Sequence, residues 1–166
     1  MSYQSDYENA LPFENLTIKQ LQRIYPGAVF EKHNVGRPTK GTCPSDILMR
    51  LNGDNVFIEV KHDIASAKYG NICIEEAALL KGDSQYIILY ADADNGCMFM
   101  FEKAGLLDKL TKDSRVIYKE RIGDSKSWKT PHAGFLVPLK WIYKMGILVK
   151  HPPFDTIWLK EFQKLI

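Results

Sequence analysis

The sequence predicts an α/β domain in which a mixed β-sheet is flanked by helices. Three observations indicate this fold class: a helical pattern near the N-terminus, a strong hairpin signal within residues 46–61, and a continuous apolar run at residues 86–90. Of the 166 residues, 45% are hydrophobic and 25% are charged, a profile that excludes disorder, collagen and low complexity. We therefore expect a single domain over residues 1–166.

The elements are expected in the order helix, strand, hairpin, helix, strand, followed by further strands and a last helix. Apolar residues recur with helical period from Pro12 to Ile24, and Pro26-Gly27 ends this helix. A polar loop is expected over residues 31–44, and helices over 72–80 and 138–145. The strands are expected at residues 28–30, 46–51, 56–61, 86–90, 97–101, 116–118 and 133–137.

The hairpin can be assigned a register from its turn. If Asn52-Gly53 are the two central residues of a tight turn, the numbers of facing residues sum to 105. Ile47 then faces Ile58 and Met49 faces Val56, so that one side of the hairpin is wholly apolar.

The other side of the same hairpin is polar at the end far from the turn. In this register Asp46 lies opposite Glu59, and Lys61 shares their face because alternate strand residues point the same way. A turn at Gly53-Asp54 changes the sum to 107 and places Asp46 opposite Lys61 instead. Both registers bring two carboxylates and one ammonium together.

Two carboxylates at this spacing repel each other, and either protonation of one or a shared divalent cation relieves the repulsion. An all-oxygen site favours Mg²⁺, which retains waters and takes one or two protein carboxylates. Such a metal polarises a phosphate oxygen and activates a bound water, while Lys61 orients that water or stabilises charge at phosphorus. The alternative is that Glu59 and Lys61 form a solvated strand face.

Charge is distributed unevenly along the chain. Residues 1–102 carry 9 Lys and Arg against 14 Asp and Glu, whereas residues 103–151 carry 11 against 4. This asymmetry favours a polyanionic partner held by the second part, although a solvated mixed surface also explains it. The residues expected to contact DNA are Lys32, His33, Arg37, Lys40, Arg115, Lys119, Arg121, Lys126 and Lys129.

Pro44-Ser45-Asp46 followed by Glu59-Val60-Lys61 resembles the signature of the PD-(D/E)xK nuclease superfamily. The resemblance implies a restriction-endonuclease-like core of a helix, three mainly antiparallel strands, a helix and a further strand, over about residues 12–90. It also implies that the basic segment of about residues 103–151 is a family-specific C-terminal extension. The motif reads P-S-D here, and only its aspartate carries chemistry.

Within the superfamily the core is most similar to the small Holliday junction resolvases. This similarity implies that Asp46, Glu59 and the Val60 carbonyl bind the metal and that Lys61 acts at the attacking water. Glu14 corresponds to an additional acidic residue on the first helix of those resolvases, with a surface carboxylate as the alternative. Residues 67–75 resemble a segment of phage and bacterial nucleases, in which Glu75 would lie near the site or would simply begin a helix.

The function expected from these residues is that of a Mg²⁺-dependent endodeoxyribonuclease, with Mn²⁺ able to replace Mg²⁺, acting on duplex or branched DNA as a homodimer. A junction resolvase and a site-specific endonuclease of restriction or homing type both fit. The alternatives are a non-catalytic DNA-binding module using residues 103–151 and, with less support, an RNA-directed nuclease. His62 points away from Lys61 and is expected to pack.

The cysteines and the apolar runs indicate a cytoplasmic, intracellular protein. Cys43, Cys73 and Cys97 lie far apart with no metal-ligand spacing, which argues against a structural zinc and a secreted disulfide framework. The first ten residues are polar and acidic, and no apolar run is long enough to span a bilayer. We therefore expect neither a signal peptide nor a membrane segment.

Overall fold

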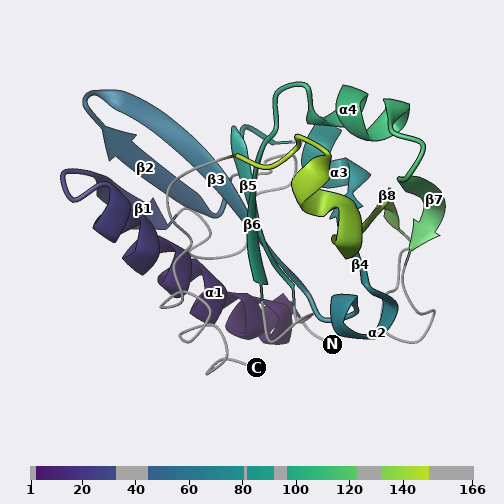
Figure 1. Cartoon of the computed structure of the whole chain (residues 1–166). Helices are drawn as coiled ribbons and strands as arrows, with labels where there is room; N and C mark the ends of the chain where they lie inside the picture. The colour runs from purple at the N-terminus through teal and green to yellow at the C-terminus, as the bar shows by residue number, and fades with distance from the viewer. Residues whose placement is uncertain (1–2, 33–44, 81, 92–96, 123–131, 150–166) are drawn as a thin grey trace.

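The structure is a computed structural model that describes residues 3–32, 45–80, 82–91, 97–122 and 132–149. It is a mixed α/β fold with a mostly antiparallel open sheet flanked by helices (Figure 1). Among the described residues no helix is long and apolar enough to cross a membrane.

The described strands form two sheets. The first sheet has the order β1-β2-β3-β5-β6 and consists of β1 (Val29–Lys32), β2 (Ile47–Leu51), β3 (Asp54–Asp63), β5 (Tyr86–Ala91) and β6 (Cys97–Glu102). The second sheet has the order β4-β8-β7 and consists of β4 (Asn71–Glu75), β8 (His132–Pro138) and β7 (Ile117–Ile122). The helices are α1 (Tyr3–Ile24), α2 (Ser66–Tyr69), α3 (Glu76–Leu80), α4 (Leu106–Lys112) and the 3₁₀ helix η2 (Leu139–Lys144).

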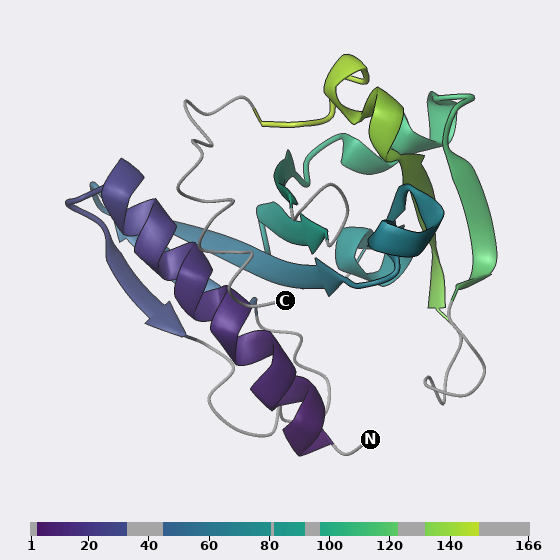
Figure 2. The ribbon, with the colours of Figure 1, turned by 60° about the horizontal axis from the view of Figure 1, so that its bottom comes forward.

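The first sheet lies between two hydrophobic clusters. On one face α1 contributes Phe13, Leu16 and Leu21 to a cluster with the inward residues of β2 and β3. On the other face the second sheet, α3, α4 and η2 pack against β5 and β6. Figure 2 shows α1 on one side of the first sheet and the second sheet on the other. Strand β5 contributes alternate residues to both clusters, which confirms the prediction of a strand buried on both faces.

The hairpin has the predicted register. Ile47 pairs with Ile58 and Met49 with Val56, so the residue numbers sum to 105. Asn52 and Gly53 have positive φ values of 53° and 88°, as a two-residue turn of the favoured hairpin type requires. Strand β3 then pairs with β5 in parallel, whereas its other neighbour, β2, is antiparallel.

Two of the helix predictions are wrong in part. Residues 72–80 were expected to be one helix, but Asn71–Glu75 form strand β4 and only Glu76–Leu80 are helical. The reason is the alternation of buried Ile72 and Ile74 with less buried neighbours, which is the two-residue period of a strand. The helix expected over residues 138–145 is the 3₁₀ helix η2.

Other boundaries also differ from expectation. Helix α1 begins at Tyr3 and contains Pro12, which was expected at its start. Helix α4 was not predicted; Leu106 and Leu110, one helical turn apart, are both buried and tie it to the core. The segment expected as an extension is therefore paired into the fold, since β8 is hydrogen-bonded to β4.

Candidate functional site

Asp46, Glu59 and Lys61 converge at the end of the hairpin away from its turn. Asp46 directly precedes β2, and its Oδ2 accepts a hydrogen bond of 2.7 Å from the Val60 amide on β3. The Lys61 ammonium lies 2.8 Å from Oε1 of Glu59. The structure thus brings together the two predicted carboxylates and the predicted lysine, and it ties Val60 to them through its amide.

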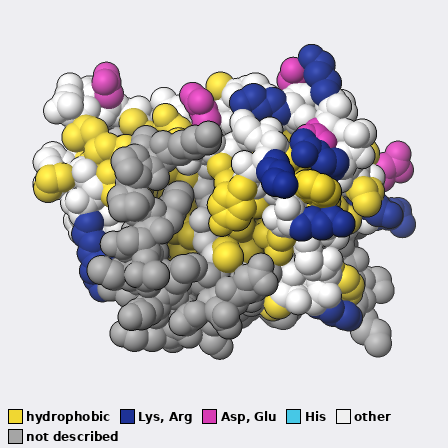
Figure 3. Space-filling model, viewed as in Figure 1, with side chains coloured by type: hydrophobic (Ala, Val, Ile, Leu, Met, Phe, Trp, Pro, Cys, Tyr) yellow, Lys and Arg dark blue, Asp and Glu magenta, His cyan; other side chains and the backbone are white. Residues whose placement is uncertain are grey.

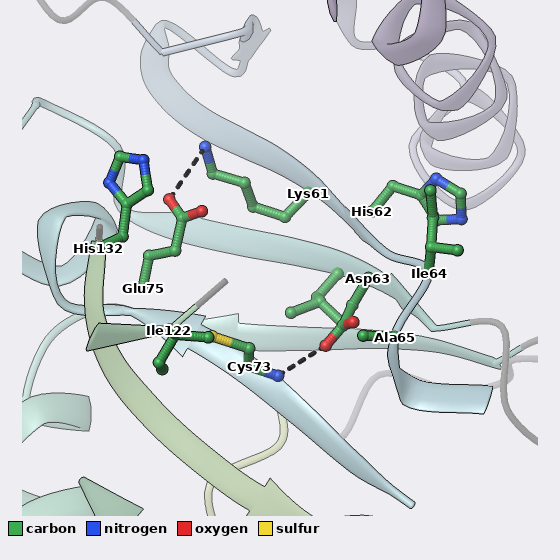
Figure 4. A pocket seen from close by; sticks show the side chains of 10 residues that line it. Lys61, His62, Asp63, Ile64, Ala65, Cys73, Glu75, Ile122 and His132 are labelled. Atoms are coloured by element: carbon green, nitrogen blue, oxygen red, sulfur yellow. Dashed lines mark hydrogen bonds and ion pairs between the residues drawn. The ribbon is translucent and has the colours of Figure 1, made fainter. Parts of the chain in front are cut away.

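A further carboxylate reaches this group from the second sheet. Glu75, the last residue of β4, lies with Oε2 3.8 Å from Nζ of Lys61. Figure 4 shows Glu75 and Lys61 pointing toward each other, with His132 of β8 beside them. Sequence reasoning included Glu75 only through the resemblance, because its position depends on β4 pairing with β8.

Glu14 of α1 belongs to the same electrostatic group. Its side chain is buried, although it is charged at neutral pH in most settings, and its Oε2 lies 3.9 Å from Nζ of Lys32. Lys32 also donates to Oδ1 of Asn15. Lys32, predicted to contact DNA, therefore lies beside the predicted acidic residue of the first helix.

Asp46 and Glu14 hold their protons more tightly than an ordinary carboxyl group does. Burial, together with the nearby Glu59 carboxylate, raises the pKa of Asp46 to about 7, against the lowering effect of the Val60 hydrogen bond. Burial also raises the pKa of Glu14, with Lys32 opposing and Glu59 adding to the increase. The site is thus short of positive charge.

Lys61 is held in its charged form. Burial disfavours the ammonium, but attraction to the carboxylates of Glu59 and Glu75 outweighs burial, so the net effect raises the pKa of Lys61. A lysine with a raised pKa does not act as a base at neutral pH. It can donate hydrogen bonds and stabilise negative charge.

The donor chemistry suits a hard divalent cation. Among the described residues no three His, Cys, Asp or Glu side chains are arranged to hold a metal by themselves. Mg²⁺ does not require such a cage, because it retains waters and takes one or two carboxylates. Asp46 and Glu59 offer this set, and a cation between them would offset the burial and the Glu59 charge that raise the pKa of Asp46.

A pocket of about 260 Å³ opens beside Lys61, between the two sheets. Lys61 and Leu89 line it from the first sheet, and Cys73, Ile122 and His132 line it from the second. Figure 4 shows Lys61, Cys73, Ile122 and His132 around this pocket. His62 also borders it, with its ring stacked on Phe13 at a centroid distance of 4.0 Å. This stacking confirms that His62 packs on the side facing α1.

The predicted DNA-contacting residues are placed only in part. Lys119 and Arg121 lie on β7, an edge strand that is largely exposed. Arg115 is hydrogen-bonded to Asp113 through two nitrogens, at 2.8 and 2.6 Å. His33, Arg37, Lys40, Lys126 and Lys129 lie outside the described residues, as does Cys43.

The structure groups Arg115, a predicted DNA contact, with two lysines of η2 to which the sequence assigned no function. Three cationic side chains surround the exposed ring of Trp141: Arg115 at 5.9 Å, Lys140 at 5.8 Å and Lys144 at 5.4 Å from its centroid. We call these three residues and Trp141 the basic cluster. Figure 3 shows Lys and Arg side chains gathered on the side of the molecule where η2 and α4 lie. The signal in the sequence was the spacing of Lys140, Trp141 and Lys144 along one short helix.

Comparison with known proteins adds no name to this geometry. No family model, no curated protein and no solved structure matches the chain.

Proposed function

We propose that this protein is a Mg²⁺-dependent endonuclease of the PD-(D/E)xK type that hydrolyses phosphodiester bonds in duplex or branched DNA. The observation that carries the proposal is the convergence of Asp46, Glu59 and Lys61 on one face of the hairpin. The succession of α1, β1, β2, β3, α3 and β5 supports it, because that is the order of elements in the superfamily core, although α2 and β4 stand between β3 and α3 here.

Each residue has a defined part in this proposal. Asp46 and Glu59, with the Val60 carbonyl, would hold the metal, and Glu14 would add negative charge behind them. When bound, Mg²⁺ supplies a Lewis acid that polarises a phosphate oxygen and lowers the pKa of a bound water. Lys61, charged and held by Glu59 and Glu75, donates hydrogen bonds to the attacking water or to the phosphate as its charge increases.

Incubation with a panel of linear, plasmid and four-way-junction DNAs tests the proposal. We expect Mg²⁺ or Mn²⁺ to support cleavage, and Ca²⁺ to support binding without cleavage because it is larger and less strict in its geometry. Excess chelator should abolish turnover. Full cleavage in chelator would overturn the assignment of Asp46 and Glu59 as metal ligands. Preferential cleavage of the four-way junction would indicate a resolvase, whereas cleavage of linear or plasmid DNA at defined sequences would indicate a site-specific endonuclease.

The proposal includes a homodimer. Cutting both strands of a symmetric substrate is most simply done by two sites related by a two-fold axis. Light scattering on the protein with and without a four-way junction in Ca²⁺ measures the number of copies bound. One copy per junction would exclude the two-fold arrangement.

A non-catalytic DNA-binding module is the second candidate, and the basic cluster favours it. Three cations around an exposed indole suit phosphate contacts with an aromatic ring available for stacking, and they require no chemistry at Lys61. The same DNA panel distinguishes the two: this candidate predicts binding to every DNA and cleavage of none, whatever the metal.

A further inference from the structure

We propose that the pocket beside Lys61 receives a nucleobase that leaves the DNA stack next to the scissile phosphate. This inference rests on the proposed nuclease function, which assigns no role to the pocket. The pocket lies next to the candidate site. Lys61 belongs both to the candidate site and to the pocket wall, so a phosphate held at Lys61 places its neighbouring nucleoside at the pocket mouth.

The lining of the pocket selects a flat and uncharged group. Leu89 is buried and Ile122 and Cys73 are partly buried, so the interior is apolar, while the ring of His132 stands at its wall. Unstacked bases are recognised by stacking on rings and apolar side chains, with a few polar groups at their edges. The pocket offers both kinds of surface.

The charges around the pocket exclude a second phosphate. The Asp63 carboxylate accepts hydrogen bonds from the amides of Ser66 at 3.1 Å and Cys73 at 2.7 Å, which fixes a carboxyl group in the wall. Glu75 adds a carboxylate beside Lys61. A phosphate entering here would meet these carboxylates, whereas a neutral base would not.

The size of the pocket agrees with one base. Pockets for whole small molecules measure about 300–1,000 Å³, and this pocket, at about 260 Å³, lies just below that range. Removing a base from the stack costs least where it is unpaired or already distorted. The pocket therefore favours branched DNA, or DNA with an unpaired nucleotide at the cleavage position, over a perfect duplex.

A matched pair of alanines tests the proposal. Ala65 and Ala67 are both exposed and lie at or in α2, but only Ala65 lines the pocket. The cleavage position is first mapped on the best-cleaved DNA of the panel, and an abasic nucleotide is then placed on each side of it in turn. We expect Ala65→Phe to lower kcat/KM about tenfold or more on intact DNA by displacing the base. On one of the abasic substrates its kcat/KM should return to the wild-type value, and Ala67→Phe should behave as wild type on all substrates.

A second pair guards against effects on folding. Ile122 lines the pocket, whereas Ile117 lies on the same strand and is exposed, so Ile122→Phe and Ile117→Phe repeat the comparison from the other wall. The proposal is overturned if a pocket variant loses kcat/KM equally on intact and abasic DNA, or if neither pocket variant loses kcat/KM. In both cases the wild type still cleaves DNA, so the nuclease function stands. A wild type that cleaves no DNA would instead refute the nuclease function.

Discussion

The candidate site and the basic cluster differ in charge, burial and position. The site joins Asp46, Glu59 and Lys61 at the end of a hairpin in the part of the chain with net charge −5, and the cluster lies on and beside η2 in the part with net charge +7. Carboxylates repel DNA unless a cation lies between, while exposed lysines attract it. Binding and chemistry should therefore be separable by mutation.

The largest expected effect concerns the candidate site. Asp46→Ala, Glu59→Ala and Lys61→Ala should each slow cleavage about 100-fold or more, because each removes a principal group that positions or stabilises charge. Binding to DNA in Ca²⁺ should persist. The matched control is Glu31→Ala, which removes a carboxylate of the same sheet that is paired with Arg50 at 2.6 Å. Normal turnover by Glu59→Ala would falsify the assignment.

The next effect concerns β4 and β8, the strand pair of the second sheet that contains Glu75. Gly134 pairs with Glu75, and a Cβ at Gly134 would lie 2.9 Å from the Ile74 carbonyl oxygen. We expect Gly134→Ala to reduce the free energy of unfolding by about 1–3 kcal/mol through this clash. Gly27→Ala is the control, since nothing lies within 4 Å of its Cβ position. Denaturant titration of both variants measures the difference, and equal stability would show that β8 can shift without cost.

Substitutions in the basic cluster should lower the affinity for DNA and leave the cleavage rate at saturating DNA unchanged. Lys140→Ala combined with Lys144→Ala should weaken DNA binding about tenfold, because two phosphate contacts and the counterions that they release are lost. The salt slope should fall by about 0.9 per lost contact. A titration of binding against salt measures both quantities.

The matched comparison is Lys119→Ala combined with Arg121→Ala, which removes the same charge from β7. If both double variants lose affinity and slope equally, the effect arises from net charge. If neither double variant changes the affinity for DNA, then neither the basic cluster nor β7 contacts DNA. Loss of discrimination at particular base pairs in the β7 variant would instead place those side chains in a groove.

The smallest expected effect is on stability and has an unusual sign. The pKa of Asp46 is raised from 3.8 to about 7 in the folded protein, so the folded state holds a proton that unfolding releases. The corresponding stability is present at low pH and is lost as the pH rises through about 7. In chelator at pH 8, the free energy of unfolding of Asp46→Asn should therefore exceed that of the wild type by about 1 kcal/mol. This value is reduced for solvent screening, because the site is partly exposed.

Denaturant titration at pH 6 and pH 8 measures this prediction. The advantage of Asp46→Asn should shrink at pH 6, where the wild-type carboxyl is largely protonated, and Mg²⁺ should stabilise only the wild type. If the wild type is at least as stable as Asp46→Asn at pH 8 in chelator, then the pKa of Asp46 is not raised by burial and the Glu59 charge.

The hairpin and strand β4 show what could be predicted from the sequence. The hairpin register follows from two adjacent residues, because Asn52 and Gly53 adopt positive φ at little cost and the alternation on both sides agrees with that turn. With the register known, the meeting of Asp46 with Glu59 follows. Residues 71–75 carry only five residues of alternation, too few to distinguish a strand from the start of a helix.

The contacts made across the fold could not be predicted from the residues alone, and only the resemblance placed Glu14 and Glu75 near the site. Glu75 approaches Lys61 because β4 pairs with β8, and Glu14 lies beside Lys32 because α1 packs against the first sheet. Neither pair has a local signal, since the partners are brought together by packing of elements distant in the chain. The basic cluster likewise depends on Arg115 meeting η2.

The pairing of β4 with β8 also determines the order in which the protein can be completed during synthesis. Glu75 of β4 pairs with Gly134 of β8, which is 59 residues later in the chain (134 − 75). Among the described residues, β8 is the only sheet partner of β4. At about 5–20 residues per second, the ribosome takes roughly 3–12 s to supply that partner. During this interval β4 has no partner strand, so the nascent chain exposes the unpaired backbone edge of a strand that carries the apolar residues Ile72 and Ile74.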